Sequence, residues 1–147
     1  MADQRRARDE EVWPPTEWLV VAEDGSVALR GGWSPTSGCY HFPLGPLCPY
    51  TGADDVEAVA LSPRGTLFGW TAVTAPPPGY DGPVPFGFGI VELAGGERGD
   101  APVRVLGRLT EPDPEALEFG QPMHVVVETL PGDRPMWAFA PIDQDRP

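Results

Sequence analysis

The stretch from Gly65 to Leu93, GTLFGWTAVTAPPPGYDGPVPFGFGIVEL, predicts two long β-strands joined by a proline-rich loop. Over residues 66–74 and 86–93 the side chains alternate, and the aromatic and β-branched residues among them fit a pleated surface. The predicted faces of the first strand are Phe68, Trp70 and Ala72 on one side, and Leu67, Thr71 and Val73 on the other. Those of the second are Phe86, Phe88 and Ile90 against Val91 and Leu93.

Three glycines lie inside these two strands, at Gly69, Gly87 and Gly89. Glycine in a strand interior marks a bend, a bulge or the close approach of another backbone, so strongly coiled strands of a small closed barrel are expected. A short strand is also predicted at Val27. Four further strands are predicted over residues 56–61, 103–109, 123–130 and 136–142. Six short strands separated by turns from residue 56 onward predict an all-β fold, a small barrel or sandwich.

The loop over residues 75–85 is too long for a tight hairpin, and its prolines have fixed backbone dihedrals. A stiff loop loses little conformational entropy when it docks, and an aromatic ring on it makes a good interface anchor. Tyr80 and Phe86 are therefore predicted contact residues. The alternative is that the loop only connects the strands and Tyr80 covers the end of the barrel.

Length and composition limit the fold and the location of the chain. The 147 residues, 41% of them apolar, suit one principal domain with a small appendage. No apolar run is long enough to span a membrane and no secretory signal is visible, so a cytoplasmic location is expected. Cys39 and Cys48 are close enough in sequence to pair, but free thiols are expected in a reducing cytosol.

The net charge of −12 argues against binding to a polyanion. Nucleic-acid binding draws much of its affinity from Lys and Arg that neutralise phosphates, and this chain has no lysine. Arg104 and Arg108 lie on the same side of one predicted strand, where they form a pair but not a basic groove.

Residues 31–52, GGWSPTSGCYHFPLGPLCPYTG, contain a set of residues with a characteristic spacing, which we call the frame. It consists of Ser34, Ser37-Gly38, Phe42-Pro43 and Cys48-Pro49-Tyr50-Thr51-Gly52. This frame resembles the ribbon of the zinc-ribbon plus OB-fold proteins, the acyl-CoA-associated family that accompanies thiolases. The ribbon of that family has the form C-x-x-C-G, then F-P, and later C-P-x-C-G. Here Ser34, Ser37 and Thr51 replace three of its cysteines, and only Cys48 remains.

A structural zinc needs thiolate or imidazole ligands, so the resemblance implies a degenerate ribbon without metal, and no cofactor is expected. Cys39, His41 and Cys48 remain an alternative, relocated metal site, although they lack a fourth ligand. In the simpler interpretation the two cysteines are small buried hydrophobes. The metal is then replaced by a miniature core of Tyr40, Phe42, Leu44, Leu47 and Tyr50.

The resemblance continues through the second half of the chain and spans roughly residues 26–142. Matching features include the GTLFGWTAVT strand, the proline-rich loop with Gly79-Tyr80, Pro85-Phe86, Gly107-Arg108-Leu109, Phe119-Gly120, and Phe139 with Pro141. It implies a small OB-fold barrel preceded by a degenerate, rubredoxin-like ribbon. The predicted division is an N-terminal tail (1–25), the ribbon (26–52), the OB-fold (53–142) and a C-terminal tail (143–147).

The resemblance also implies a non-catalytic accessory subunit of a thiolase-like, aldolase or ketosynthase-like acyl-CoA enzyme, in a hetero-oligomer. Such subunits stabilise their partner and help to hold the CoA thioester at the shared interface. Tyr80, Phe86 and Trp70 are the predicted contacts, with Arg64 as a candidate for a CoA phosphate. The sequence contains no residue pattern that predicts an active site in this chain itself. His124 is expected to be a polar residue that points outward from its strand. The alternative function is single-stranded nucleic-acid binding, with bases stacked on Trp70 and Phe88.

Overall fold

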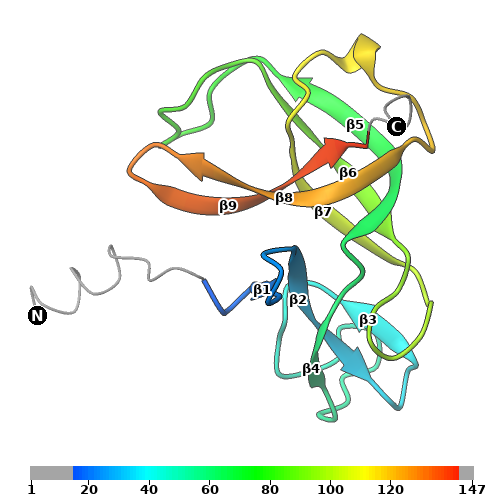
Figure 1. Cartoon of the computed structure of the whole chain (residues 1–147). Coiled ribbons are helices and arrows are strands. Elements are labelled where there is room, and N and C mark those ends of the chain that lie inside the picture. The colour runs from blue at the N-terminus through cyan, green and yellow to red at the C-terminus, as the bar shows by residue number, and fades with distance from the viewer. Residues whose placement is uncertain (1–14, 143–147) are drawn as a thin grey trace, which may run out of the picture.

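The two strands joined by the proline-rich loop form an antiparallel pair, β5 (Arg64–Val73) and β6 (Phe86–Leu93). This is seen in a computed structural model of the chain, which describes residues 15–142. With β7 (Val103–Leu109), β8 (Pro122–Leu130) and β9 (Arg134–Pro141) they close a barrel in the order β5-β6-β7-β9-β8 (Figure 1). Only β7 and β9 pair in parallel. The prediction of an all-β protein with a small OB-fold barrel is confirmed.

The remaining strands form a four-stranded sheet that lies beside the barrel (Figure 1). The strands of this sheet are β1 (Leu19–Val21), β2 (Val27–Ser34), β3 (Cys39–His41) and β4 (Glu57–Ala60). Because β1, β3 and β4 all pair with β2, the sheet joins residues from the predicted tail, ribbon and OB-fold. The predicted strand at 56–61 therefore belongs to this sheet and not to the barrel.

The predicted N-terminal tail divides into two parts. Residues 1–14 lie outside the described residues, as does the predicted C-terminal tail, 143–147. Residues 15–25 include β1, whose Leu19 is only 1% exposed. The Trp18 ring packs edge-on against Trp137 of β9, with 5.4 Å between the ring centroids. This apolar part of the predicted tail therefore packs onto the domain.

A β-bulge at Phe68 changes the predicted faces of β5. The register between β5 and β6 shifts between Leu67 and Gly69, so Phe68 is an extra residue without a partner. As a result, Leu67 is buried in the core and Trp70 packs against the same core, while Phe68 is exposed. The prediction that Phe68 and Trp70 share a face was wrong, because an inserted residue reverses the alternation beyond it.

The strand-interior glycines of β6 have the structural role that the sequence predicts. A Cβ atom at Gly89 would lie 2.5 Å from the carbonyl oxygen of Gly69, and one at Gly87 would overlap the carbonyl oxygen of Glu111. Another part of the backbone therefore approaches both positions closely, as expected for a tightly coiled barrel.

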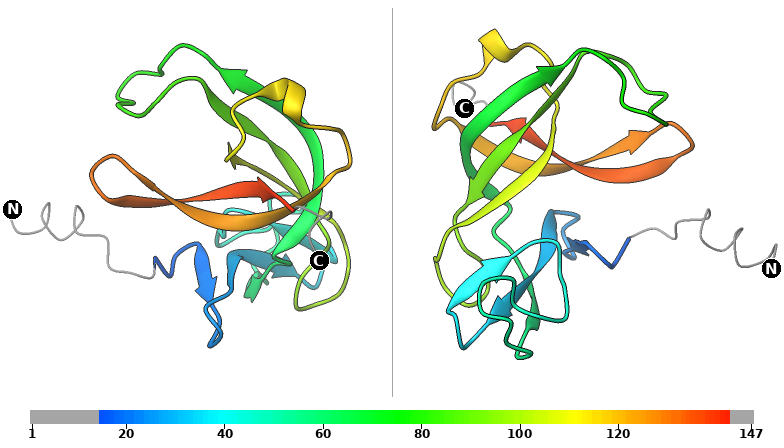
Figure 2. Two further views of the ribbon diagram at one scale, coloured as in Figure 1. Left: turned by 45° about the horizontal axis from the view of Figure 1, so that its top comes forward. Right: turned by 180° about the vertical axis from the view of Figure 1, so that it is seen from behind.

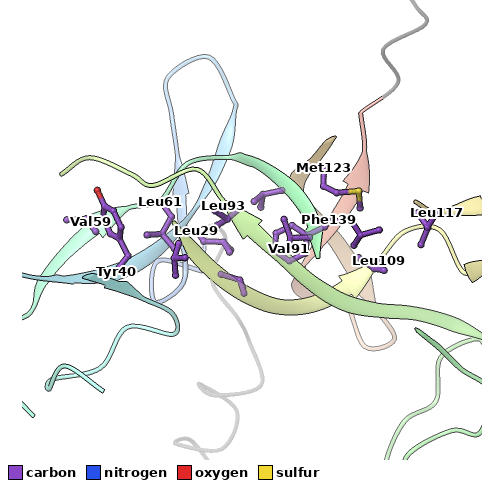
Figure 3. Packing of buried hydrophobic residues seen from close by; sticks show 14 residues of the cluster. Leu29, Tyr40, Val59, Leu61, Val91, Leu93, Leu109, Leu117, Met123 and Phe139 are labelled. Atoms are coloured by element: carbon purple, nitrogen blue, oxygen red, sulfur yellow. The ribbon is translucent and has the colours of Figure 1, made fainter. Parts of the chain in front are cut away.

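One hydrophobic core runs through both parts of the molecule. Figure 3 shows its side chains in a row from Tyr40 and Val59 in the small sheet, past Leu93, to Phe139 in the barrel and Leu117 in the segment between β7 and β8. The short 3₁₀-helix η1 (Pro114–Ala116) lies between β7 and β8 and is capped by Asp113, whose side chain accepts a hydrogen bond from Glu115 N. Within residues 15–142, no helix has both the length and the apolar character needed to cross a membrane.

Candidate functional site

Arg108 contacts residues of three elements at one end of the barrel, where the β5–β6 loop lies against β7 and β8. Its guanidinium lies 4.6 Å from the ring centroid of Phe86 and 5.6 Å from that of Tyr80. Arg108 Nε donates a hydrogen bond of 3.1 Å to Glu128. Desolvation lowers the pKa of Arg108, but Tyr80 and Glu128 raise it by more, so the net shift is upward. The guanidinium is therefore a fixed charge that holds the loop to the barrel.

Tyr80 and Phe86, two of the predicted contact residues, lie together in this cluster. Their ring centroids are 5.0 Å apart, and both residues are half-buried. The Tyr80 hydroxyl donates to the carbonyl of Pro83 at 2.8 Å, so the ring folds back onto its own loop. In Figure 2 the β5–β6 loop and the β8–β9 hairpin project from the same side of the barrel. The contact role of Tyr80 and Phe86 stays a prediction.

The Arg108 cluster gives a stability prediction with a matched control. We expect Arg108→Met to lower the free energy of unfolding by about 1–2 kcal/mol, because it leaves the half-buried Glu128 carboxylate unpaired. Arg104→Met removes a similar ion pair from the same strand, but the Arg104 side chain is 57% exposed. Its cost should stay below about 1 kcal/mol. Urea denaturation of both variants measures the difference, and equal losses would contradict a special role for Arg108.

The other two predicted contact residues, Trp70 and Arg64, lie elsewhere. Trp70 packs against the core, and its Nε1 donates to the carbonyl of Pro114 at 2.9 Å. Arg64 begins β5, whereas the proline-rich loop follows its last residue, Val73. The structure therefore does not bring the four predicted contacts into one site.

Arg64 lies beside His124 in a concave surface between the two parts of the protein. The two residues pair across β5 and β8 and line a hollow of about 320 Å³ with Ser26 and Pro63. The hollow shares Ser26 and Pro63 with a groove of about 520 Å³, whose other lining residues are mostly small and apolar. His124 lies between the buried residues Met123 and Val125 and is itself only half-buried, so the prediction of an outward His124 is confirmed.

The four expected zinc-ligand positions come together in two similar turns. In the first, Gly38 N donates to Ser34 O, and in the second Gly52 N donates to Cys48 O, both at 2.8 Å. Gly38 and Gly52 have positive φ angles of 66° and 76°, which glycine adopts without strain. The turns meet where Cys48 Sγ lies 3.5 Å from Ser37 Oγ.

These residues do not fit a structural zinc, because three of the four positions carry neutral hydroxyls. Instead, hydrogen bonds from Thr51 and Ser37 lower the pKa of the Cys48 thiol to about 7. Asp55 holds the first turn, since it accepts from Ser34 Oγ at 2.7 Å and from Thr36 N at 2.9 Å. Hydrogen bonds from Ser34 and Thr36 lower the pKa of Asp55 to about 2.

The structure does not assemble the alternative metal site. Within residues 15–142, no group of three or more His, Cys, Asp and Glu side chains could hold a metal ion, so Cys39, His41 and Cys48 do not form one. Both cysteines are free thiols, as predicted. The predicted miniature core is only partly formed. Tyr40 is buried and Phe42 packs against the core, but Leu44, Leu47 and Tyr50 are exposed, since the turns at 44–52 project outward without a covering strand.

His41 is buried in the small sheet, and neither nitrogen of its ring has a well-formed hydrogen bond. The residue is only 5% exposed. Its neighbour across β2 and β3 is Gly32, where any Cβ atom would overlap the imidazole. Burial lowers the pKa of His41, and the Gly45 backbone only partly opposes this shift.

The lowered pKa of His41 predicts a loss of stability in mild acid. The unfolded chain takes up a proton near the ordinary pKa of about 6.5, before the folded chain does. The contribution of His41 to the free energy of unfolding should therefore be constant above about pH 6.5 and fall as the pH drops towards the folded pKa. Denaturant unfolding at a series of pH values, compared between wild type and His41→Phe, measures this effect. NMR titration of the His41 ring gives an independent check, and a midpoint at or above the ordinary value would contradict the prediction.

Two exposed apolar residues on the outside of the barrel were not predicted as functional. Leu106 is 56% exposed between Arg104 and Arg108 on β7, and Phe119 is 72% exposed beside Phe68. The alternation of side chains in β7, VRVLGRL, predicts that Leu106 points outward, because it places Leu106 on the same face as Arg104 and Arg108. Phe119 carries no comparable local signal.

Comparison with known proteins agrees with the barrel geometry. Residues 58–128 match the sequence model of the family described as "ChsH2, C-terminal OB-fold domain". The small OB-fold barrel of the structure agrees with this description. The matched region runs from β4 into β8, so it includes β5, β6 and β7.

Two further proteins resemble the chain. A DUF35 domain-containing scaffold protein of Pyrococcus furiosus is 33% identical over 89 residues, which cover 60% of this chain and 61% of the relative. The chain thus matches about three fifths of the length of that curated relative. A solved structure, the Ltp2-ChsH2(DUF35) aldolase, superimposes with a TM-score of 0.60 at 22% identity, over 78% of this chain and 84% of that chain. At this identity the likeness supports the fold alone.

Proposed function

We propose that the chain is a non-catalytic accessory subunit of an acyl-CoA enzyme. It binds and stabilises a thiolase-like, aldolase or ketosynthase-like partner and helps to form the CoA-thioester site of that partner. The observation that carries this proposal is the match of residues 58–128 to the ChsH2 C-terminal OB-fold domain. The relative from Pyrococcus furiosus, named a scaffold protein, supports a non-catalytic role, and we propose a cytoplasmic location.

The Arg108 cluster fits this role. Tyr80 and Phe86 are fixed by Arg108 and by the Pro83 carbonyl, so the loop offers its rings in one conformation. A rigid aromatic pair loses little entropy on docking. We propose that Tyr80 and Phe86 contact the partner, and that Arg64 binds a CoA phosphate at a separate point in the hollow beside His124.

The test is to co-purify the chain with the thiolase-like, aldolase and ketosynthase-like enzymes of its source organism. We expect a stable complex, a higher unfolding temperature of the enzyme when the chain is bound, and no turnover of acyl-CoA esters by the chain alone. Failure to form a complex with such an enzyme, or turnover by the isolated chain, would disprove the proposal.

The alternative of single-stranded nucleic-acid binding has weaker support. Trp70 packs on the core and Phe88 is exposed on the outside, so the two rings do not form one stacking platform. Arg104 and Arg108 are both ion-paired, with Glu92 and Glu128. A fluorescence titration with an oligonucleotide at low salt tests this alternative, and tight, salt-dependent binding would favour it.

A further inference from the structure

An apolar surface covers the outside of β5, β6 and β7. It consists of Phe68, Phe86, Phe88, Ile90, Leu106 and Phe119, which we call the outer apolar face. Phe68, Phe88, Leu106 and Phe119 are between 37% and 72% exposed. Large apolar side chains gathered on the outside of a soluble domain usually mark an interaction site.

Strand register and ring contacts make the outer apolar face continuous. Ile90 of β6 is directly opposite Leu106 of β7, and Phe88 of β6 is opposite Arg108. At the β5 edge the Phe68 and Phe119 ring centroids are 5.9 Å apart. The bulge contributes to this arrangement, because it turns Phe68 outward while Leu67 and Trp70 stay with the core.

The charges within the outer apolar face are already neutralised. Arg104 reaches across β6 so that its guanidinium lies 3.9 Å from the Phe68 ring centroid, and its Nε is 3.1 Å from Glu92. Arg108 lies over Phe86 in the same way and pairs with Glu128. A partner that covers this surface therefore meets stacked, paired guanidiniums and not isolated charges, which lowers the cost of desolvation.

The charge of the rest of the chain selects the kind of partner. Residues 111–118, EPDPEALE, carry four carboxylates and no cation, and lead directly into Phe119. In an isologous dimer each copy, with its net charge of −12, would meet another chain of the same charge. A second copy is therefore disfavoured, and a different protein with basic residues around an apolar centre is favoured.

We propose that the outer apolar face is the docking surface for the enzyme partner, which supplies an apolar patch bordered by basic residues opposite segment 111–118. This inference rests on the proposed function and assigns it a surface. The position on the fold agrees with it, since β6 and β7 are the second and third strands of the barrel, the face that OB-folds commonly use for ligands.

The experiment compares two leucines of nearly equal exposure. Leu106, 56% exposed, lies at the centre of the outer apolar face, and Leu47, 53% exposed, lies in the turns before β4. Wild type, Leu106→Glu and Leu47→Glu are titrated by calorimetry against the purified thiolase-like, aldolase or ketosynthase-like enzymes of the source organism. We expect Leu106→Glu to weaken binding by at least about 30-fold, and Leu47→Glu by less than about 3-fold. Phe119→Glu, outside the strands, replaces Leu106→Glu if that variant does not fold.

Each other outcome has a distinct meaning. If wild type and both variants bind the enzyme equally, the docking surface is wrong and the proposed function stands. If wild type does not bind the enzyme, the proposed function fails and this inference fails with it. If sedimentation shows that wild type dimerises and Leu106→Glu does not, the occupant is a second copy and the proposal of a different partner is overturned.

Discussion

Gly65→Ala is expected to destabilise the protein by at least about 3 kcal/mol, because Gly65 lies where the barrel closes. This residue pairs with Leu93 of β6 on one side and with Met123 of β8 on the other. A Cβ atom there would overlap the carbonyl oxygen of Glu92 and would lie 2.9 Å from the Cα of Leu93. These are backbone atoms, so they cannot move away as the end of a flexible side chain can. The variant must separate β5 from β6 at their junction.

Gly69→Ala is the matched control, since both glycines belong to β5. A Cβ atom at Gly69 meets no atom within 4 Å, so this variant should change the free energy of unfolding by less than about 1 kcal/mol. Urea unfolding of both variants, followed by near-UV circular dichroism, measures the two effects. Similar losses in the two variants would show that glycine flexibility, and not the close approach at Gly65, determines stability in this strand.

Strong local patterns were enough to predict much of the barrel. The strands Phe86–Leu93 and Val103–Leu109 have the predicted bounds, because their alternation is regular and turn residues bound them. Gly69 signals a bend or a bulge in β5, but the position of the extra residue at Phe68 could not be predicted, since it is defined by pairing with β6. For the same reason the pairing of β4 with β2 was missed, because it joins segments that are distant in sequence.

The candidate site was predictable only where its residues are neighbours in sequence. Tyr80 and Phe86 were selected from the proline-rich loop, and the structure places them together. Arg108, which holds them, comes from another strand, and no pattern in the loop points to it. Trp70 was predicted to share a face with Phe68 and to be a contact, but the bulge separates the two residues and Trp70 packs against the core. Residue type and spacing thus identified the loop, and tertiary pairing determined how it is fixed.

Restoring three cysteines should convert the ribbon into a zinc site. In tetrahedral zinc sites with Zn–S distances of about 2.3 Å, the sulfur atoms lie about 3.8 Å apart. Ser37 Oγ and Cys48 Sγ already lie 3.5 Å apart, and the two glycine turns hold Ser34 and Thr51 beside them. We therefore expect Ser34→Cys, Ser37→Cys and Thr51→Cys, combined in one chain, to bind one zinc ion. We expect wild type to carry none.

The expected effect is large, because zinc held by thiolates in a small ribbon contributes directly to folding. At free zinc about 1,000-fold above its dissociation constant, the gain in the free energy of unfolding should be about 4 kcal/mol. Elemental analysis and unfolding with and without a chelator measure binding and stability, with Cys39→Ser in every variant to remove the neighbouring thiol. Adding Cys48→Ser to the triple variant removes the fourth thiolate and should weaken zinc binding by at least about 100-fold. A triple variant that binds no zinc would show that the two turns are not the remnant of a metal site, whereas a zinc ion in wild type would return attention to Cys39, His41 and Cys48.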